Sequence, residues 1–431
     1  MNLIEIGMKA KLASREIAML NTEKKNEVLG VCAEALLSNM DAILAANKRD
    51  LETAEEKNMP KNLQDRLMLN KERVAAMAEG LKEMVLLDDP VGEVIETIAR
   101  PNGLAIEKKR VPLGVIGIIY EARPNVTSDA FGLCFKTGNV AVLKGGSDAI
   151  ETNIETVKIL RDAIKSCEIT EDALLLIEDT DRETARKFMA LKEYIDVLIP
   201  RGSAGLIKTV VESSTVPVIE TGSGNCHIYV DKSADIGMAV EIIVNAKTQR
   251  PSVCNACESL LVNKEIARAA LPVFAKALLE HGVEMRCDGA AYEIISWALS
   301  DGGISDLSSE GKDLVVKGEE SDWGREFLDD IISINIVDDV DSAIKHINKY
   351  NTGHSESIIT SDEESAEKFL REVDAACVYV NASTRFTDGF EFGFGGEIGI
   401  STQKLHARGP MGLKELTSYK YLIRGTGQAR Q

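Results

Sequence analysis

The segment QRPSVCNACE, residues 249–258, places Cys254 between a helical pattern and a strand-like apolar run. A free thiol has a pKa of about 8.5 and is mostly protonated at neutral pH. A nucleophilic cysteine therefore needs a nearby cation or helix terminus, and Arg250 is a candidate for that cation. Because most intracellular cysteines are buried apolar side chains, this segment alone leaves a purely structural role open.

Cys254 and Cys257 also form a CxxC pair, a spacing found in redox and metal sites. A structural zinc site takes four ligands, yet the sequence has no second CxxC and its five histidines show no ligand spacing. We therefore expect no metal. A redox disulfide stays as an alternative, although the strand-then-helix context of a thioredoxin-like pair is missing.

Three glycine-containing turns follow strand-like runs: VLKGGSD with Lys144, Gly146 and Ser147; PRGSAG with Gly202, Ser203 and Gly205; and ETGSG with Glu220, Gly222 and Gly224. Glycine lets a backbone turn sharply or approach a ligand closely. Free amides at a helix start can receive a pyrophosphate, so the first two turns are candidate cofactor loops. The third turn is either a domain connection or part of a cleft in which Glu220 meets Cys254.

Composition restricts the kind of protein. A chain of 431 residues predicts two or three domains, and no apolar run approaches the ~18 residues of a membrane span. The 69 acidic and 50 basic side chains give a net charge of -19, which disfavours binding to nucleic acid. Without a secretion signal, and with eight scattered cysteines, we expect a soluble cytoplasmic protein with reduced thiols.

The elements that must position these residues follow two patterns. Residues 1 to about 95 show helical periodicity, with apolar residues at three- and four-residue intervals. From residue 111, short apolar runs alternate with helical stretches, and a second such series begins near residue 226. This alternation predicts an α/β protein with two doubly wound domains, each a parallel sheet covered by helices. The acidic stretch 300–320 is expected to be a surface excursion or an edge element.

Several segments together resemble the aldehyde dehydrogenase superfamily over nearly the whole chain. They are YEARPNVTSD, LKGGSDA, PRGSAGLIK, ETGSGNCHIYVD, QRPSVCNACESLLV and YVNASTRFTDGFEFGFGGEIGISTQKLHARGPMG. The glycine loops are common to many members. QRPSVCNA and GISTQKLHARGPMG are specific to a branch that reduces an acyl phosphate.

The resemblance implies a catalytic mechanism. Cys254 would attack L-glutamyl 5-phosphate and form a thioester, which NADPH would reduce to glutamate 5-semialdehyde on the route to proline. Asn125 would join the Cys254 backbone amide in stabilising the developing oxyanion. Glu220 stands where aldehyde-oxidising relatives keep a base for hydrolysis, a step that a reductase avoids. We therefore expect Glu220→Gln to reduce turnover less than Cys254→Ser.

The resemblance also implies cofactor-binding residues. Lys144 would reach the adenosine ribose, and Ser147 replaces a glutamate found in NAD-preferring relatives, which favours NADP(H). Glu326 aligns with the glutamate that binds the nicotinamide ribose, and a solvated acidic surface is its alternative role. For the anionic substrate we expect arginine ligands from a set of three, with loop-bracing salt bridges as the alternative: Arg123, Arg250 and Arg385.

The same resemblance implies the domain boundaries. Residues 1–97 and 111–225 would form the NADP-binding domain, and 226–395 the catalytic domain. Residues 98–110 and 396–431 would form an oligomerisation arm and tail, giving a homodimer or a higher homo-oligomer. The expected partners are the small-molecule substrate and a glutamate kinase that channels it, with no nucleic acid and no membrane.

Overall fold

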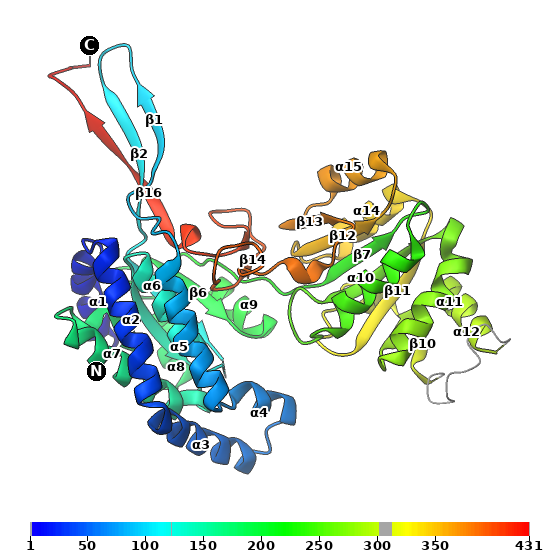
Figure 1. Ribbon diagram of the computed structural model, residues 1–431, viewed down its shortest axis with the longest axis horizontal. Coiled ribbons are helices and arrows are strands. Elements are labelled where there is room, and N and C mark those ends of the chain that lie inside the picture. The colour runs from blue at the N-terminus through cyan, green and yellow to red at the C-terminus, as the bar shows by residue number, and fades with distance from the viewer. Residues whose placement is uncertain (1, 122, 301–312, 431) are drawn as a thin grey trace. The chain divides into compact units, whose positions relative to one another are not determined.

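The structure, a computed structural model, describes residues 2–121, 123–300 and 313–430, and the chain divides into two compact units (Figure 1). The first unit comprises Met1–Thr221, Gly393–Gly399 and Pro410–Gln431. The second comprises Gly222–Phe392 and Ile400–Gly409. Within the described ranges no single helix is long and apolar enough to cross a membrane, although the bent helix pair Thr22–Ser38 and Met40–Glu56 passes by length and composition.

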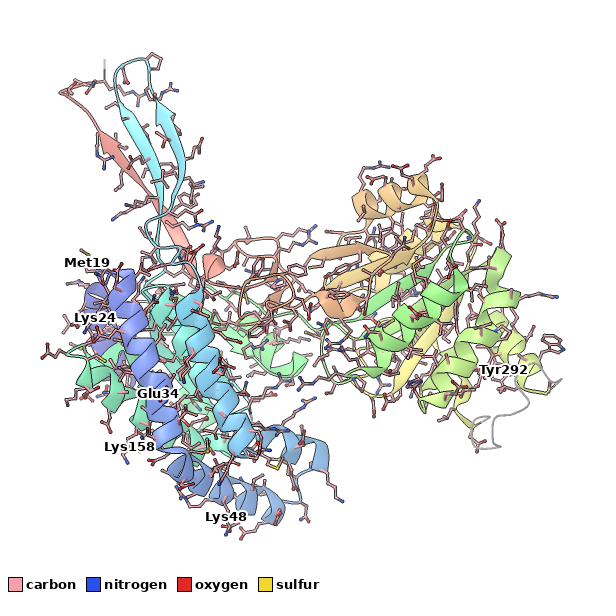
Figure 2. All side chains as sticks on the ribbon, in the orientation of Figure 1. Met19, Lys24, Glu34, Lys48, Lys158 and Tyr292 are labelled. Atoms are coloured by element: carbon pink, nitrogen blue, oxygen red, sulfur yellow. The ribbon has the colours of Figure 1, made fainter. Side chains whose placement is uncertain are left out.

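The first unit begins with helices, as the periodicity of the sequence predicts. They are α1 (Leu3–Ile17), α2 (Thr22–Ser38), α3 (Met40–Glu56), α4 (Lys61–Leu67) and α5 (Lys71–Leu86). Asn21 and Asn70 begin α2 and α5 by accepting a backbone amide of the first turn. Val28, Leu29 and Leu36 of α2 are buried, and α2 packs against α5 and α7 (Ile150–Ser166). Glu34, on the outer side of α2, forms an ion pair with Lys82 of α5 at 2.7 Å (Figure 2).

A parallel four-stranded sheet forms the centre of the first unit, in the order β5–β4–β3–β6. Its strands are β3 (Val115–Tyr120), β4 (Val140–Gly145), β5 (Leu174–Leu176) and β6 (Val197–Arg201). The helices that follow these strands in the sequence are α6 (Val126–Lys136), α7 (Ile150–Ser166), α8 (Arg182–Met189) and α9 (Ala204–Ser213). The chain runs from β3 outwards to β5 and then crosses to the other side of β3 for β6. Such sheets bind ligands at this switch point, beyond the carboxyl ends of the strands.

The predicted arm and tail form one antiparallel sheet. Its strands are β1 (Val94–Ala99), β2 (Ala105–Pro112) and β16 (Thr417–Arg424), and it extends away from the helices of the first unit (Figure 1). β16 pairs with β2 without a register shift, from Thr417 opposite Pro112 to Arg424 opposite Ala105. Segments far apart in the sequence thus share one ladder of hydrogen bonds.

Within the described residues, the second unit contains a parallel seven-stranded sheet in the order β10–β9–β11–β8–β7–β12–β13. Its strands are β7 (Cys226–Val230), β8 (Cys257–Asn263), β9 (Glu284–Cys287), β10 (Val315–Lys317), β11 (Ile331–Val337), β12 (Ser355–Ile359) and β13 (Cys377–Val380). Its helices are α10 (Ile236–Thr248), α11 (Lys264–Glu280), α12 (Gly289–Ser300), α14 (Val340–Tyr350) and α15 (Glu363–Glu372).

Both faces of this second sheet are covered by helices. Ile228, Leu260 and Val262 pack into a core with α10, α11 and α12. Tyr229 and Leu261, which alternate with them, pack into a separate core with α14 and α15. Figure 1 shows the two helix groups on opposite sides of the strands. The predicted α/β class, with parallel sheets covered by helices, is therefore confirmed.

Two details of the domain division differ from the sequence expectations. The chain passes from the first unit to the second between Thr221 and Gly222, slightly before the expected boundary. Residues 400–409, expected in the tail, belong to the second unit, where Lys404 and Arg408 form ion pairs with Asp374. Of the acidic stretch 300–320, residues 301–312 lie outside the described ranges; β10, in the described part, forms an edge strand of the sheet, which is one of the two expected alternatives.

Candidate active site

Cys254 lies in the turn between α10 and β8, at the amino edge of the second sheet. Among the eight cysteines, all within the described ranges, it alone is not buried. Gly224, which precedes β7, packs directly on this turn. A Cβ atom added to Gly224 would lie 1.4 Å from the Cys254 carbonyl oxygen and 2.8 Å from its Cα atom. Because any side chain would overlap this carbonyl group, the turn requires glycine at position 224.

Two buried side chains hold the same turn, one by binding its backbone and one by reaching from the turn to another segment. Cys226 Sγ donates a hydrogen bond to the Cys254 carbonyl oxygen at 3.2 Å. Asn255 Nδ2 donates to the carbonyl oxygens of Arg385 and Thr387, at 3.3 and 2.9 Å. These contacts fix the nucleophile turn relative to the segment that carries Arg385.

Arg385 and Arg250 place positive charge near this cysteine. Arg385 is half-buried after β13, and its Nε donates to Gln249 Oε1 at 3.0 Å. Burial lowers the pKa of its guanidinium group; the negative charges of Asp388 and the Cys254 thiolate favour the charged form, and Arg250 opposes it. A guanidinium group stays protonated in proteins, so Arg385 is a permanent cation in the neighbourhood of Cys254.

Cys257, the second cysteine of the CxxC pair, has a different environment. It begins β8, is fully buried, and its Sγ donates to the Ser259 carbonyl oxygen at 3.4 Å. Burial raises the pKa of this thiol to about 12. Since the thiolate is the reactive form, Cys257 is a poor redox partner and Cys254 remains the candidate nucleophile.

Glu326 contacts the same part of the second unit. Its Oε1 accepts a hydrogen bond from the Gly224 amide at 2.7 Å. Burial raises the pKa of this carboxyl group, and the bond from Gly224 partly offsets that effect. Glu326 is therefore a half-buried residue held against the glycine that touches Cys254, and the alternative of a solvated acidic surface is not what the structure shows.

Lys144 is the second-last residue of β4, at the carboxyl edge of the first sheet, and its side chain is buried. Its Nζ donates to the Gly145 carbonyl oxygen at 3.2 Å. Burial lowers the pKa of the ammonium group, while Asp179 and Asp181 favour its charge. A buried cation at this edge is suited to bind the hydroxyl groups of a ribose.

Gly146 and Ser147 follow Lys144 directly. The Gly146 amide donates to the Tyr120 carbonyl oxygen at 2.8 Å, which ties this turn to the end of β3. Ser147 begins a short 3-10 turn, Ser147–Ala149, and its hydroxyl donates weakly to Asp148 Oδ1 at 3.5 Å. The predicted ribose-binding turn therefore carries a hydroxyl group beside a carboxylate.

Glu121 and Ser203 lie at the switch point, directly after β3 and β6. Glu121 accepts two hydrogen bonds from Ser203, from the amide at 2.9 Å and from the hydroxyl at 2.6 Å. A Cβ atom on Gly202 would lie 2.7 Å from the Glu121 carboxyl carbon, whereas Gly205 has only Ser203 Oγ near it, at 3.9 Å. The predicted phosphate donors of Ser203 are therefore bound to a carboxylate of the chain itself.

Asn125 begins α6, where its exposed side chain donates through Nδ2 to Asp129 Oδ2 at 2.9 Å. Burial raises the pKa of Asp129 to about 6, and the bond from Asn125 opposes this shift. An amide nitrogen carries two hydrogens, so Asn125 can donate to a ligand as well. Arg123 is exposed in the preceding loop, in the first unit, while Arg250 and Arg385 belong to the second.

Glu220 is half-buried near the end of the first unit, after the bridge that joins Leu198 to Val218. Gly222 and Gly224 of the same turn belong to the second unit. The pairing of Glu220 with Cys254 in one cleft stays a prediction.

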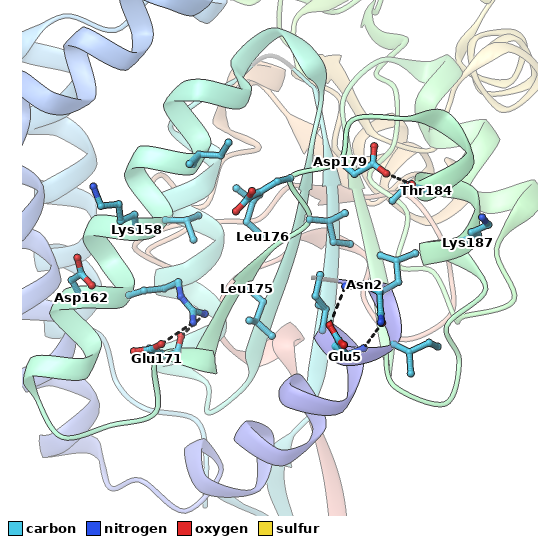
Figure 3. Close-up of a pocket in the computed structure, with 18 of the residues that line it drawn as sticks. Asn2, Glu5, Lys158, Asp162, Glu171, Leu175, Leu176, Asp179, Thr184 and Lys187 are labelled. Carbon is cyan, nitrogen blue, oxygen red and sulfur yellow. Dashed lines mark hydrogen bonds and ion pairs between the residues drawn. The ribbon is translucent and has the colours of Figure 1, made fainter.

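A cavity of about 1000 Å³ lies in the first unit, between the start of α1, helix α7, strand β5 and residues 177–187 (Figure 3). Its lining is mixed in charge, and Arg161 is already paired with Glu171 and Asp172. The predicted site residues are all described, and none of them lines this cavity. We therefore place the candidate active site at the sheet edges instead.

Sequence reasoning missed several of the contacting residues: Glu121, Asp129, Lys247, Asn255 and Glu258. One pair could have been found, because Glu258 interrupts a buried apolar strand and Lys247 ends an apolar helix. Buried charges need partners, so two isolated charges in neighbouring apolar elements predict an ion pair.

Known proteins resemble the chain over nearly its whole length. The aldehyde dehydrogenase family profile matches residues 9–322 and 315–422. A gamma-glutamyl phosphate reductase of Agathobacter rectalis is 57% identical over 430 residues, which cover 100% of both chains. The crystal structure of a gamma-glutamyl phosphate reductase from Thermotoga maritima has a TM-score of 0.94 at 48% identity, with 100% of both chains covered.

A more distant structure shows the fold alone. An acetylating aldehyde dehydrogenase from Geobacillus thermoglucosidasius has a TM-score of 0.68 at 17% identity, covering 99% of this chain and 97% of that one. The chain belongs to the aldehyde dehydrogenase family, whose members are oxidoreductases that use nicotinamide cofactors. Within the family it groups with the gamma-glutamyl phosphate reductases.

Proposed function

We propose that the chain catalyses the NADPH-dependent reduction of L-glutamyl 5-phosphate to L-glutamate 5-semialdehyde and phosphate, in the cytoplasm, as a step of proline biosynthesis. Full-length similarity to gamma-glutamyl phosphate reductases supports the substrate. The observation that carries the mechanism is the partial exposure of Cys254, the one cysteine that is not buried, in a turn closely packed against Gly224.

In the first step, the Cys254 thiolate attacks the acyl carbon of the substrate. A carbon–sulfur bond forms, the carbon–oxygen bond to phosphate breaks, and phosphate leaves with the electron pair. The positive charge of Arg385 near Cys254 favours the thiolate over the thiol. The product of this step is a thioester on Cys254.

In the second step, the thioester is reduced to an aldehyde and Cys254 is released. A reduced nicotinamide cofactor supplies the hydride for this step. The carbonyl oxygen becomes negative in both steps, and the Cys254 backbone amide is the proposed donor to it, with Asn125 as the second donor. Removing one such donor typically costs on the order of 10²–10³ in turnover.

The residues of the first unit fit a dinucleotide at its adenosine end. Lys144 offers an ammonium group for the ribose, and Ser147 offers a hydroxyl group without the charge that would repel a 2′-phosphate. Asp148 lies beside Ser147 and weakens this preference. At the other end of the dinucleotide, Glu326 is the proposed ligand of the nicotinamide ribose.

Two of the three arginines are favoured as substrate ligands. Arg385 is held near Cys254 by its own contacts, and Arg250 lies close enough to affect the pKa of the Arg385 guanidinium group. Bidentate binding of a carboxylate or a phosphate is the natural function of such groups. We propose that self-association through the β1–β2–β16 sheet completes the enzyme, which light scattering at micromolar concentration can test.

The proposal is tested by the reverse reaction, the phosphate-dependent oxidation of glutamate 5-semialdehyde with NADP. Wild-type protein is expected to form NADPH only when phosphate is present. Cys254→Ala is expected to lose this activity, whereas the matched control Cys287→Ala, at a buried thiol of the same unit, keeps it. Activity that survives in Cys254→Ala would refute the mechanism, and a preference for NAD would refute the cofactor assignment.

A further inference from the structure

A buried ion pair joins α10 to β8 directly after the nucleophile turn. Lys247 Nζ donates to Glu258 Oε2 at 2.7 Å, and the exposed fraction of both side chains is 0%. Burying two charges is costly, and an apolar pair of similar volume is often as stable or more stable. Fold stability alone therefore does not account for a charged pair at this place.

The second oxygen of Glu258 binds a backbone amide. Leu328 N donates to Glu258 Oε1 at 3.0 Å. Leu328 has a φ of 56°, in the left-handed region that leucine rarely adopts, and it belongs to residues 325–328, which form neither helix nor strand. Glu258 thus holds an irregular segment at its strained residue.

Glu326 belongs to the same irregular segment. Its carboxylate accepts the Gly224 amide at 2.7 Å, and Gly224 in turn touches the Cys254 carbonyl oxygen. The segment is therefore held at two points, by Glu258 at Leu328 and by Gly224 at Glu326. One carboxylate oxygen of Glu326 is used by Gly224, which leaves the other for a ligand.

We infer that Lys247 and Glu258 are positioning residues: they hold the amide of Leu328 so that Glu326 is placed for cofactor binding. Lys247 orients the Glu258 carboxylate through Oε2, which directs Oε1 toward Leu328. The inference rests on the proposed function, in which Glu326 binds the nicotinamide ribose. It adds a role for two residues that do not themselves touch cofactor or substrate.

The test compares two double variants that both remove the buried charges. Lys247→Met/Glu258→Gln keeps an amide oxygen that can accept the bond from Leu328. Lys247→Met/Glu258→Leu keeps the volume but offers no acceptor. We expect the Leu variant to bind NADPH about tenfold more weakly than the Gln variant. A tenfold change in the dissociation constant corresponds to the net contribution of about one hydrogen bond.

Two controls separate positioning from general damage. Adenosine 2′,5′-bisphosphate lacks the nicotinamide ribose, so its dissociation constant is expected to be the same in both double variants. Lys25→Met/Asp89→Leu removes a matched buried ion pair of the first unit, whose Asp89 also accepts a backbone amide, from Val91 at 3.0 Å. This control is expected to shift Tm but to leave NADPH affinity unchanged.

A third comparison tests whether the effect passes through Glu326. Glu326→Ala is expected to weaken NADPH binding in the Gln double variant and to have little further effect in the Leu variant. Should the Leu double variant fail to fold, Lys247→Leu/Glu258→Met tests the same contact with the volumes exchanged.

Equal NADPH affinity of the two double variants would overturn the inference, as would an equal loss of affinity for NADPH and for adenosine 2′,5′-bisphosphate. The proposed function fails separately, because a wild-type protein that binds no NADPH would refute the cofactor assignment before any variant is made.

Discussion

The two sheets of the chain hold their candidate site residues in different ways. At the carboxyl edge of the first sheet, Lys144 and Ser203 end or follow strands, and their partners are carboxylates or carbonyl groups of the adjoining loops. At the amino edge of the second sheet, Cys254 and Glu326 lie before strands and are held through Gly224. The side chains at the first edge can exchange their present partners for a ligand. The turn at the second edge is fixed by the contact between Gly224 and the Cys254 carbonyl group, where no side chain fits.

This difference indicates which of the two sheet edges can move when a ligand binds. A loop whose donors are satisfied by Glu121 can exchange that partner for a ligand at little cost, because the atoms packed against Gly202 belong to the Glu121 side chain, which can move, and not to the backbone. A turn in which a glycine touches the nucleophile's carbonyl group cannot move without moving the nucleophile. We therefore expect substitutions at Gly224, in contact with the Cys254 turn, to act on turnover, and substitutions at Glu121, beside the Ser203 loop, to act on cofactor affinity.

The largest expected effect is that of Gly224→Ala. The new methyl group would overlap the Cys254 carbonyl oxygen, so the turn must shift, and a shift of about 1 Å can cost 10²-fold in turnover. The matched control is Gly205→Ala, where the Cβ atom meets only Ser203 Oγ at 3.9 Å. Steady-state kinetics of both variants test this prediction. Equal turnover numbers for Gly224→Ala and Gly205→Ala would contradict it.

The next effect is that of the arginines. Arg385→Lys is expected to raise KM for the acyl phosphate or the semialdehyde about tenfold, because lysine cannot bind an anion in a bidentate manner. Arg123→Lys, at an exposed loop of the first unit, is expected to change KM less. Unchanged KM in Arg385→Lys, Arg250→Lys and Arg123→Lys would remove all three from the substrate site.

A pH effect of several-fold is expected from Asp129, whose pKa is raised by burial from 3.8 to about 6. As the pH falls through about 6, the carboxylate takes up a proton and binds the Asn125 amide less well, so turnover is expected to fall. Between pH about 4 and 6 the folded chain holds a proton that the unfolded chain releases, so this group reduces stability as the pH rises.

The variant that checks this pH effect is Asp129→Asn, which cannot titrate. Its profile of kcat against pH is expected to be flatter than that of the wild type between pH 5 and 7, and its unfolding free energy should depend less on pH between pH 4 and 6. If kcat of the variant still falls at the same acid pH, a group other than Asp129 must cause the fall.

The smallest expected effect is that of Glu121→Gln, at the first edge. The side-chain oxygen of the new glutamine can still accept a hydrogen bond from Ser203. One negative charge is lost, however, from the switch point where the cofactor's pyrophosphate is predicted to bind. We expect NADPH to bind a few-fold more tightly, with less gain at high salt, where charge effects are screened. Weaker binding would mean that Glu121 organises the loop rather than competing with the ligand.

Much of the fold could be predicted because its signals are local. The apolar runs of β3, β4, β7 and β8 and the helical periodicity between them need no knowledge of distant residues. The strand β9 and the helix α12 were not predicted. The four residues of β9, EMRC, alternate charged and apolar side chains, but so short an alternation does not identify a strand inside the sheet.

The site was only partly predictable for the same reason. The resemblance placed Cys254 and Glu326 in the sequence, but which residues hold them depends on strand order, since Glu258 reaches Leu328 across neighbouring strands. Likewise, Glu121 meets Ser203 because β3 lies beside β6, a pairing set by tertiary structure. Side chains that support a site from another element leave no local pattern in the sequence.

The most direct test of the account is to stop the reverse reaction at the thioester. Wild-type protein mixed with glutamate 5-semialdehyde and NADP, without phosphate, is expected to release about one NADPH per active site and to carry an acyl group on Cys254, seen by peptide mass spectrometry. Adding phosphate should remove the acyl group and restart turnover. A burst of the same size from Cys254→Ala, or an acyl group on another residue, would contradict the central claim.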